Sequence, residues 1–132
     1  MTNFPQGVAS FGLPILPAIS GDDMKAGGGV VFWVDSGYTG GASNGTFAKP
    51  DLTLAAAITR VTASNGDVIY VKPGHAETVS ADVDHTKAGL TIIGLGVGSI
   101  RPTITISGAT TDITFSGNDV YLANLILFQE IF

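Results

Sequence analysis

The feature that most constrains the fold is a set of short strand segments that recur at similar intervals along the chain. These β-branched, apolar segments are Val68–Val71, Leu90–Gly94, Ile104–Gly108, Ile113–Gly117 and Val120–Ile126. Comparable positions lie 23 residues apart from Ile69 to Ile92, 21 apart from Ile92 to Ile113 and 22 apart from Ile104 to Ile126. A spacing of twenty-odd residues is typical of stacked coils, in which each coil buries its apolar face against the next. The repeats therefore predict a scaffold, and its function must be argued from particular residues.

Two of these segments alternate apolar and hydroxyl side chains. In residues 103–107 and 113–116, Ile or Phe alternates with Thr or Ser. Successive residues of a strand point to opposite faces. We therefore expect the apolar residues to point into the stack and the hydroxyls to line its outside, with corner turns at 109–112 and 118–119.

One segment has helical spacing. Leu54, Ala57, Ile58 and Val61 fall on one face of a helix. The sequence predicts a capping helix near residues 51–63 that begins at Pro50 or Asp51. A strand at 30–35 and a Gly- and Ser-rich loop at 36–49 precede it. We interpret residues 30–132 as one β domain.

The first 29 residues have a different composition. Residues 4–17 contain three prolines and two glycines among apolar residues, a pattern that excludes a helix interior and suits a central strand poorly. We predict an extended apolar arm that needs a partner surface, joined to the domain through a flexible Gly-rich joint; a tail folded back on its own domain is the alternative. The predicted partner-binding residues are Phe4, Pro5, Val8, Phe11, Leu13, Pro14, Ile15, Leu16 and Pro17.

Charge and composition argue against several classes of function. The net charge is −5, charged residues make up 13% of the 132, and there are no cysteines. The sequence has no basic stripe to bind a nucleic acid backbone and no basic amphipathic helix to bind a membrane. Lack of cysteine excludes a disulfide scaffold and a Cys-ligated zinc site. The N-terminus does not resemble a secretory signal, and no apolar run has the length of a membrane span, so we expect assembly in the cytoplasm.

Two glycine motifs match functional patterns without their usual surroundings. Gly41–Gly45 matches the Gly-x-Ser-x-Gly nucleophile elbow, but loop residues flank it where a strand and a helix are needed. Gly94–Gly98 resembles part of a dinucleotide-binding turn, but the sequence after it predicts a strand and not a helix. We interpret both as turns.

A few polar and aromatic residues are candidates for binding or catalysis. Glu77, Asp82, Asp84 and His85 are a candidate cation site, with a solvated loop as the alternative. His75 follows a Pro-Gly turn, so we expect it to be exposed, and Asp22-Asp23 lie in the Gly-rich joint. The aromatics Phe32, Trp33, Tyr38 and Phe47 either stack on sugars or close the core. The sequence predicts no catalytic residue, cofactor or metal.

Several segments, taken in order, resemble a known superfamily. They are Phe32–Gly37, Asn44–Pro50, Leu54–Ile58, Gly66–Gly74, Leu90–Gly96 and Asn118–Leu125. Together they resemble the opening of pectate-lyase-like right-handed parallel β-helix domains, over roughly residues 30–127. The resemblance implies an all-β fold: a short right-handed parallel β-helix of about three coils with one capping α-helix. Active members of the superfamily have more coils and charged catalytic residues on the central ones, whereas these strands carry almost no charge.

The resemblance also suggests a function. The apolar, Pro- and Gly-containing segment at residues 4–14 is similar to the N-terminal arms of bacteriophage virion proteins, including head decoration proteins. We therefore expect a non-enzymatic virion structural protein, most simply a capsid decoration or cement protein. Its expected partners are a major capsid or other virion protein and two further copies of itself in a homotrimer, without nucleic acid or membrane. A tailspike-type polysaccharide lyase or hydrolase, and a glycan- or receptor-binding fibre fragment, are the alternatives.

Overall fold

The computed structural model describes residues 8–10, 13–15 and 29–130. The strands in this part of the chain are β1 (Val8–Ser10), β2 (Leu13–Ile15), β3 (Val31–Val34), β4 (Val68–Val71), β5 (Ala76–Val79), β6 (Val83–His85), β7 (Thr91–Gly94), β8 (Thr103–Ser107), β9 (Ile113–Phe115), β10 (Tyr121–Ala123) and β11 (Ile126–Glu130). The helix α1 spans Leu54–Arg60, and a single 3-10 turn, η2, spans Gly98–Ile100. The expected all-β class with one helix is confirmed.

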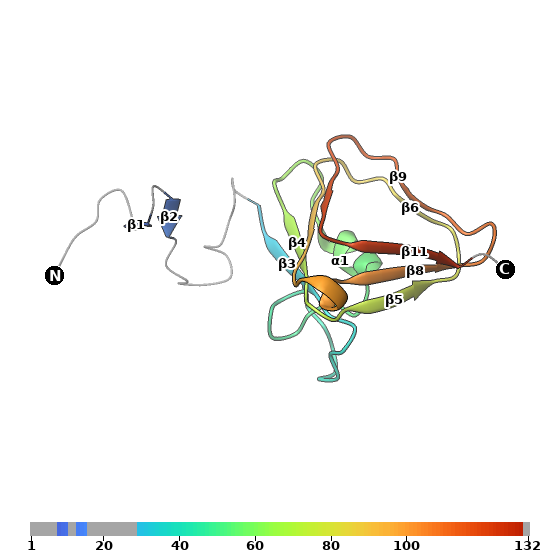
Figure 1. Ribbon diagram of the computed structural model, residues 1–132. Coiled ribbons are helices and arrows are strands. Elements are labelled where there is room, and N and C mark those ends of the chain that lie inside the picture. The colour runs from blue at the N-terminus through green and yellow to red at the C-terminus, as the bar shows by residue number, and fades with distance from the viewer. Residues whose placement is uncertain (1–7, 11–12, 16–28, 131–132) are drawn as a thin grey trace.

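From β3 onward the strands form three parallel sheets. The strand orders are β10-β7-β4-β3, β11-β8-β5 and β6-β9. The chain passes through the three sheets in the order β4, β5, β6, repeats that order in β7, β8, β9, and begins it again in β10 and β11. Each turn of chain therefore lies on the turn before it, and the three sheets surround a common interior (Figure 1).

The register confirms part of the predicted repeat and corrects the rest. Ile69 pairs with Ile92, as their spacing of 23 residues predicts. Ile92, however, pairs with Leu122 and not with Ile113, which lies in another sheet. Ile104 pairs with Leu127, one position beyond the predicted Ile126. The predicted spacing was wrong because successive turns differ in length, and the parallel register holds whatever the length of the corners.

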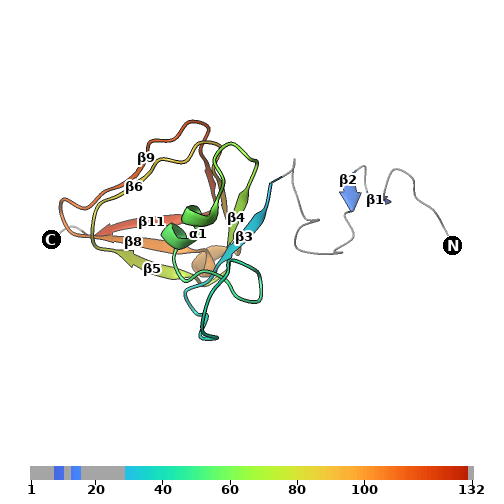
Figure 2. The same cartoon turned by 180° about the vertical axis from the view of Figure 1, so that it is seen from behind.

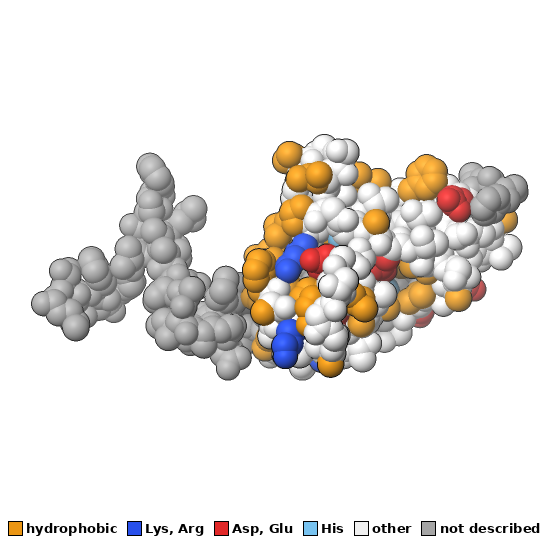
Figure 3. Space-filling model, turned by 90° about the horizontal axis from the view of Figure 1, so that it is seen from below, with side chains coloured by type: hydrophobic (Ala, Val, Ile, Leu, Met, Phe, Trp, Pro, Cys, Tyr) orange, Lys and Arg blue, Asp and Glu red, His pale blue; other side chains and the backbone are white. Residues whose placement is uncertain are grey.

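Apolar side chains from α1 and from the strands β3, β4, β7 and β8, together with the adjoining Val61 and Leu90, fill the closed part of the interior. The buried core consists of Val34, Leu54, Ala57, Ile58, Val61, Ile69, Val71, Leu90, Ile92 and Ile104. In β8 the Ile104 side chain is 2% exposed, while its neighbours Thr103 and Thr105 are only partly buried. The predicted alternation of inward Ile and outward Thr is therefore confirmed in this strand. Figure 3, which views the molecule from the side of β5 in Figure 1, shows a face with few charged groups.

Helix α1 begins later and ends earlier than predicted. Its N-cap is Thr53, whose hydroxyl accepts a hydrogen bond from the backbone N–H of Ala56 at 3.2 Å, and its C-cap is Val61. Asp51 lies outside the helix because its backbone pairs with β3: its N–H donates to Trp33 and its carbonyl accepts from Asp35. The helix packs against β3 and β4. Figure 2 shows the molecule from behind the view of Figure 1. In Figure 2 α1 lies in front of the interior, on the side away from the viewer of Figure 1.

The predicted arm residues are described only in part. β1 and β2 pair antiparallel, with Val8 opposite Ile15 and Ser10 opposite Leu13. Of the predicted partner-binding residues, Val8, Leu13, Pro14 and Ile15 lie in these two strands. Phe4, Pro5, Phe11, Leu16 and Pro17 lie outside the described residues, as do Asp22 and Asp23 of the joint.

Candidate functional site

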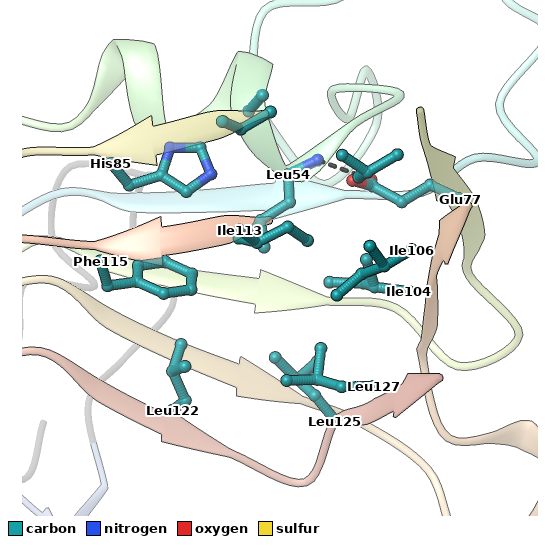
Figure 4. Close-up of a pocket in the computed structure, with 13 residues that line it drawn as sticks. Leu54, Glu77, His85, Ile104, Ile106, Ile113, Phe115, Leu122, Leu125 and Leu127 are labelled. Atoms are coloured by element: carbon teal, nitrogen blue, oxygen red, sulfur yellow. Dashed lines mark hydrogen bonds between the residues drawn. The ribbon is translucent and has the colours of Figure 1, made fainter. Parts of the chain in front are cut away.

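The most distinctive site in the described chain is an apolar cavity of about 140 Å³ inside the stack. It is lined by Leu54, Ala55, Glu77, Val79, Val83, His85, Ile104, Ile106, Ile113, Phe115, Leu122, Leu125 and Leu127. These residues come from α1 and from three successive layers of the stack, which are the turns of chain that contain β4 to β6, β7 to β9, and β10 and β11. Figure 4 shows their side chains around the cavity. Protein interiors are normally close-packed, so a space of this size marks a place where another group fits.

The two ends of the stack are built differently. At the end formed by β3, the strand edge is closed by the loop before α1: Trp33 donates to the Gly45 carbonyl at 2.8 Å and accepts from Asp51 at 2.9 Å. Helix α1 covers the interior beside this edge, with Leu54 only 3% exposed. Both the backbone groups and the core are therefore covered at this end by the chain itself.

The other end is formed by β10 and β11, and there the described chain supplies no further layer. Each of these strands pairs with one neighbouring strand in the described structure and presents its other edge. Leu122 and Leu127, whose partners Ile92 and Ile104 are buried, are 37% and 57% exposed. Tyr121 and Phe128 are 59% and 55% exposed at the same end. We refer to these four residues and the outer edges of β10 and β11 as the open end.

His85 lies in the wall of the cavity, a position that the sequence did not predict. Only 9% of it is exposed, and its ring lies 5.1 Å from the ring of Phe115 in the next layer. Neither ring nitrogen has a hydrogen-bond partner among the described residues. No fully enclosed side-chain nitrogen or oxygen in this part of the chain lacks a partner, so the ring nitrogens must border open space. Burial lowers the pKa of His85, and the charges of Asp84 and Glu77 oppose this shift only partly.

Glu77 connects the cavity wall to a buried hydrogen-bond network. Its Oε2 accepts from the backbone N–H of Leu54 at 2.8 Å and from Nε2 of His75 at 2.9 Å. Nδ1 of His75 accepts from the backbone N–H of Ser36 at 3.0 Å, which fixes the tautomer with the proton on Nε2. The prediction that His75 is exposed was wrong, because this residue is 1% exposed and joins β5 to the loop after β3.

A second buried acid fixes the loop between β3 and α1. Asp51 is fully buried and accepts from Nε of Arg60 at 2.8 Å, Nη2 of Arg60 at 3.0 Å and Oγ of Ser43 at 2.9 Å. The hydrogen bond from Arg60 to Asp51 raises the pKa of that guanidinium, although burial opposes the shift. Ser43 is the central residue of the Gly-x-Ser-x-Gly motif, and its hydroxyl donates to Asp51. The motif therefore anchors a loop.

A third buried acid, Asp67, holds the turn before β4. It accepts from the backbone N–H groups of Val30 at 2.8 Å and Thr62 at 2.7 Å, and from the side chain of Asn65 at 2.8 Å. Burial raises the pKa of Asp67, but these three hydrogen bonds and the charge of Lys87 outweigh burial, so the net pKa is lowered. Lys87 itself donates to the carbonyls of Thr59 and Val61 at the end of α1.

The candidate cation residues do not converge. Asp82 accepts from the backbone N–H of Asp112, and Asp84 accepts from the hydroxyl of Ser116 at 2.8 Å. Glu77 is occupied by Leu54 and His75, and His85 borders the cavity. Within the described ranges, no group of three or more acidic or His side chains is placed to hold a metal ion.

The aromatic residues divide between the core and the outer surface. Phe32 packs against the buried core. Trp33 lies edge-on to Phe47 with ring centres 4.9 Å apart, and its ring centre is 5.1 Å from that of Tyr70. Phe47 is 62% exposed, and the ammonium of Lys72 lies 4.1 Å from its ring centre. Trp33, Phe47 and Tyr70 therefore form an outer aromatic group beside a cation.

The Gly94–Gly98 segment forms a corner of the stack. The side-chain amide of Asn124 donates to the carbonyls of Gly94 at 2.9 Å and Gly96 at 2.8 Å. Asn124 has a positive φ of 56°, a conformation that asparagine tolerates better than most residues. The turn interpretation of this motif agrees with these contacts.

Comparison of the chain with protein-family models, with curated proteins and with solved structures gives no match. Among the described residues, no helix combines the length and the apolar character that crossing a membrane requires.

Proposed function

We propose that this chain is a short right-handed parallel β-helix of the pectate-lyase-like type that acts as a non-enzymatic structural protein of a bacteriophage virion. In this proposal it is a capsid decoration or cement protein whose N-terminal arm binds a major capsid or other virion protein. The order of the three parallel sheets supports the β-helix, because every turn of chain stacks on the previous one in register. Handedness rests on the resemblance of residues 30–127.

The observation that carries the assembly role is the contrast between the two ends of the stack. Loop 44–51 and α1 close one end, while the open end presents strand edges and four exposed apolar side chains. An exposed strand edge with apolar side chains is a template for pairing with another chain. Burial of such surface contributes roughly 25 cal/mol per Å², which favours association once the ordering costs are met. In this proposal the assembly is a closed homotrimer in which the copies cover one another's open ends.

The buried acids support a structural rather than a catalytic role for the polar residues. Asp51, Asp67 and Glu77 each accept hydrogen bonds that fix a loop or a helix end. Buried carboxylates held in this way stabilise one conformation of the loops around α1.

Light scattering after size-exclusion chromatography tests the assembly role. We expect an oligomer for the full chain and a shift toward monomer for Leu127→Asp, which places a charge at the open end. Leu52→Asp is the matched control, because Leu52 is 45% exposed at the other side of the domain. A monomeric full chain at high micromolar concentration, or equal effects of the two variants, contradicts assembly through this end.

The virion role has its own test in particles of the phage that encodes the chain. We expect the protein in purified virions, and we expect deletion of residues 1–17 to remove it from them while the far-UV circular dichroism of the domain is retained. A truncated protein that still incorporates excludes anchoring by the arm. Absence of the full chain from virions excludes the virion role altogether.

The outer aromatic group favours glycan binding as a second candidate. Phe47 is largely exposed and packs edge-on against Trp33, and aromatic faces of this kind stack on sugar rings. A glycan array with the full chain and with Phe47→Ala tests this function. Binding that survives the substitution, or no binding at all, argues against this group as a sugar site.

A further inference from the structure

The cavity combines an apolar wall with two polar side chains, each of which has at least one nitrogen or oxygen atom without a hydrogen-bond partner in the described chain. Isoleucine, leucine and phenylalanine side chains form most of the wall, and His85 and Glu77 are its two ionisable members. The ring nitrogens of His85 have no partner in the described chain. Oε2 of Glu77 accepts two hydrogen bonds, whereas its Oε1 has none there. Because enclosed polar atoms without partners are absent from this part of the protein, these atoms border accessible space. For His85 that space comprises this cavity and a hollow that it shares with Asp84 and Lys87.

We infer that this cavity binds a small, uncharged, apolar molecule that carries one hydrogen-bond donor, such as a hydroxyl on an aromatic ring, with the donor directed at His85. This inference concerns a ligand site and does not depend on the proposed virion role.

The size of the cavity selects the apolar part of the ligand. A cavity of about 150 Å³ lined by Leu, Ile and Phe stays dry and takes up benzene or xenon. The cavity here, at about 140 Å³, has a similar wall and a similar volume. It is smaller than the roughly 300–1,000 Å³ of pockets for drug-sized ligands. A single six-membered ring with one small substituent therefore fits, and a nucleotide or a sugar does not.

The polar atoms select the charge and the functional group of the ligand. Burial favours the neutral imidazole of His85, which can accept a hydrogen bond from an O–H group. The carboxylates of Glu77 in the cavity wall and Asp84 beside His85 disfavour an anionic ligand. Figure 4 shows His85 at one side of the cavity, above Phe115, with its ring directed toward the space between the layers.

The route into the cavity follows from the structure of the open end. Leu122 and Leu127 line the cavity and are also partly exposed. A ligand can therefore enter between these side chains without unfolding the stack.

Binding of phenol, benzene and benzoate to the full chain, measured by ligand-observed NMR titration, tests the inference. These three probes have the same ring and differ in donor and charge. We expect phenol to bind about fivefold more tightly than benzene, as one neutral hydrogen bond supplies, and benzoate to bind more weakly than either. Failure of both phenol and benzene to bind, or equal affinities for the two, overturns the inference.

Two variants locate the site. His85→Phe keeps an aromatic ring of similar size and removes the acceptor, so phenol should fall to the affinity of benzene. Ile106→Trp places a larger side chain in the cavity and should abolish binding of both probes. Val79→Phe serves the same purpose at another wall position if Ile106→Trp does not fold, as judged by circular dichroism. Phenol binding that is unchanged in His85→Phe, or probe binding that persists in a folded cavity-filling variant, contradicts the site.

Discussion

Replacement of Asp67 by asparagine removes one acceptor from a buried group that holds three donors. Oδ1 accepts from Val30 and from Asn65, and Oδ2 accepts from Thr62. The carboxylate is 2% exposed, so solvent cannot replace a lost partner. Asparagine keeps one oxygen and puts an NH₂ group in the place of the other. The least costly orientation keeps the acceptor toward Val30 and leaves the N–H of Thr62 facing another donor.

The size of the effect follows from these contacts. A buried N–H without an acceptor costs about 1–3 kcal/mol. Asp67→Asn should therefore lower the free energy of unfolding by about 1–3 kcal/mol at neutral pH, and Asp67→Ala, which also removes the acceptor for Val30, by about 2–6 kcal/mol. For a domain of this length, each kcal/mol lowers Tm by roughly 3–6 °C. Asp119→Asn is the matched control, because Asp119 is exposed at a corner.

The pH dependence distinguishes a charged acceptor from a polar contact. The net pKa of Asp67 is lowered in the folded protein, so on acidification the unfolded state takes up the proton first. The stabilisation by the carboxylate is complete above the ordinary pKa of about 3.9 and is lost as pH falls through the lowered folded value. Urea unfolding at pH 7 and at several values below pH 4 measures this. Wild type and Asp67→Asn should differ most at pH 7 and converge in acid.

Two results refute the reasoning about Asp67. If Asp67→Asn is as stable as Asp119→Asn at pH 7, the three hydrogen bonds contribute nothing net. If the difference from wild type stays constant down to pH 2, the carboxylate charge is not the source of the stability.

Three further predictions concern other buried contacts. Gly94→Ala should destabilise the domain by more than about 1 kcal/mol in thermal unfolding, because its Cβ would collide with the backbone oxygen of Asn124; equal Tm values contradict this contact. Arg60→Met leaves the buried Asp51 without its cation and should cost about 1–3 kcal/mol, discounted because the Arg60 side chain is 37% exposed. The double variant with Asp51→Asn should recover part of that loss, and strict additivity argues against coupling. His85→Phe should remove the loss of stability that the wild type shows as pH falls below about 6.5, because the lowered pKa of His85 means that the unfolded state is protonated first; identical pH profiles of wild type and variant in urea unfolding count against a buried neutral ring.

The sequence predicted those features that depend on local pattern. The helical spacing of Leu54, Ala57 and Ile58 placed α1 correctly, because its buried face is a property of neighbouring residues. The limits of α1 were wrong because Asp51 pairs with β3, a contact that no local pattern contains. The inward direction of Ile104 followed from alternation with threonine in the same way.

The features that were missed depend on residues far apart in the chain. A Pro-Gly turn predicts that His75 is exposed. Instead its ring is buried and accepts a hydrogen bond from the backbone N–H of Ser36, which lies 39 positions away in the sequence. Ile113 was predicted to lie in register with Ile92, but it belongs to another sheet, because corners of unequal length separate the strands. The cavity follows from the distances between layers and from side-chain volumes. The nearest signal in the sequence is the run of apolar residues from Leu125 to Phe128.

At the open end the three sheets do not stop at the same layer, and this difference determines what a partner must supply if assembly occurs there. The first two sheets have a strand in the third layer, β10 and β11, whereas the described part of the third sheet stops at β9 in the second layer. A partner segment laid parallel to β9 would complete the third layer, and its inward side chains would meet Leu122 and Leu127 across the mouth of the cavity. Such a segment needs apolar residues at alternate positions and few charges, because Glu130 is the one charged residue in β10 and β11. It would also enclose the cavity, so occupancy of the cavity and assembly at the open end are expected to affect each other. Measurement of the oligomeric state with and without phenol connects the two sites, since any coupling must appear as a change in both equilibria.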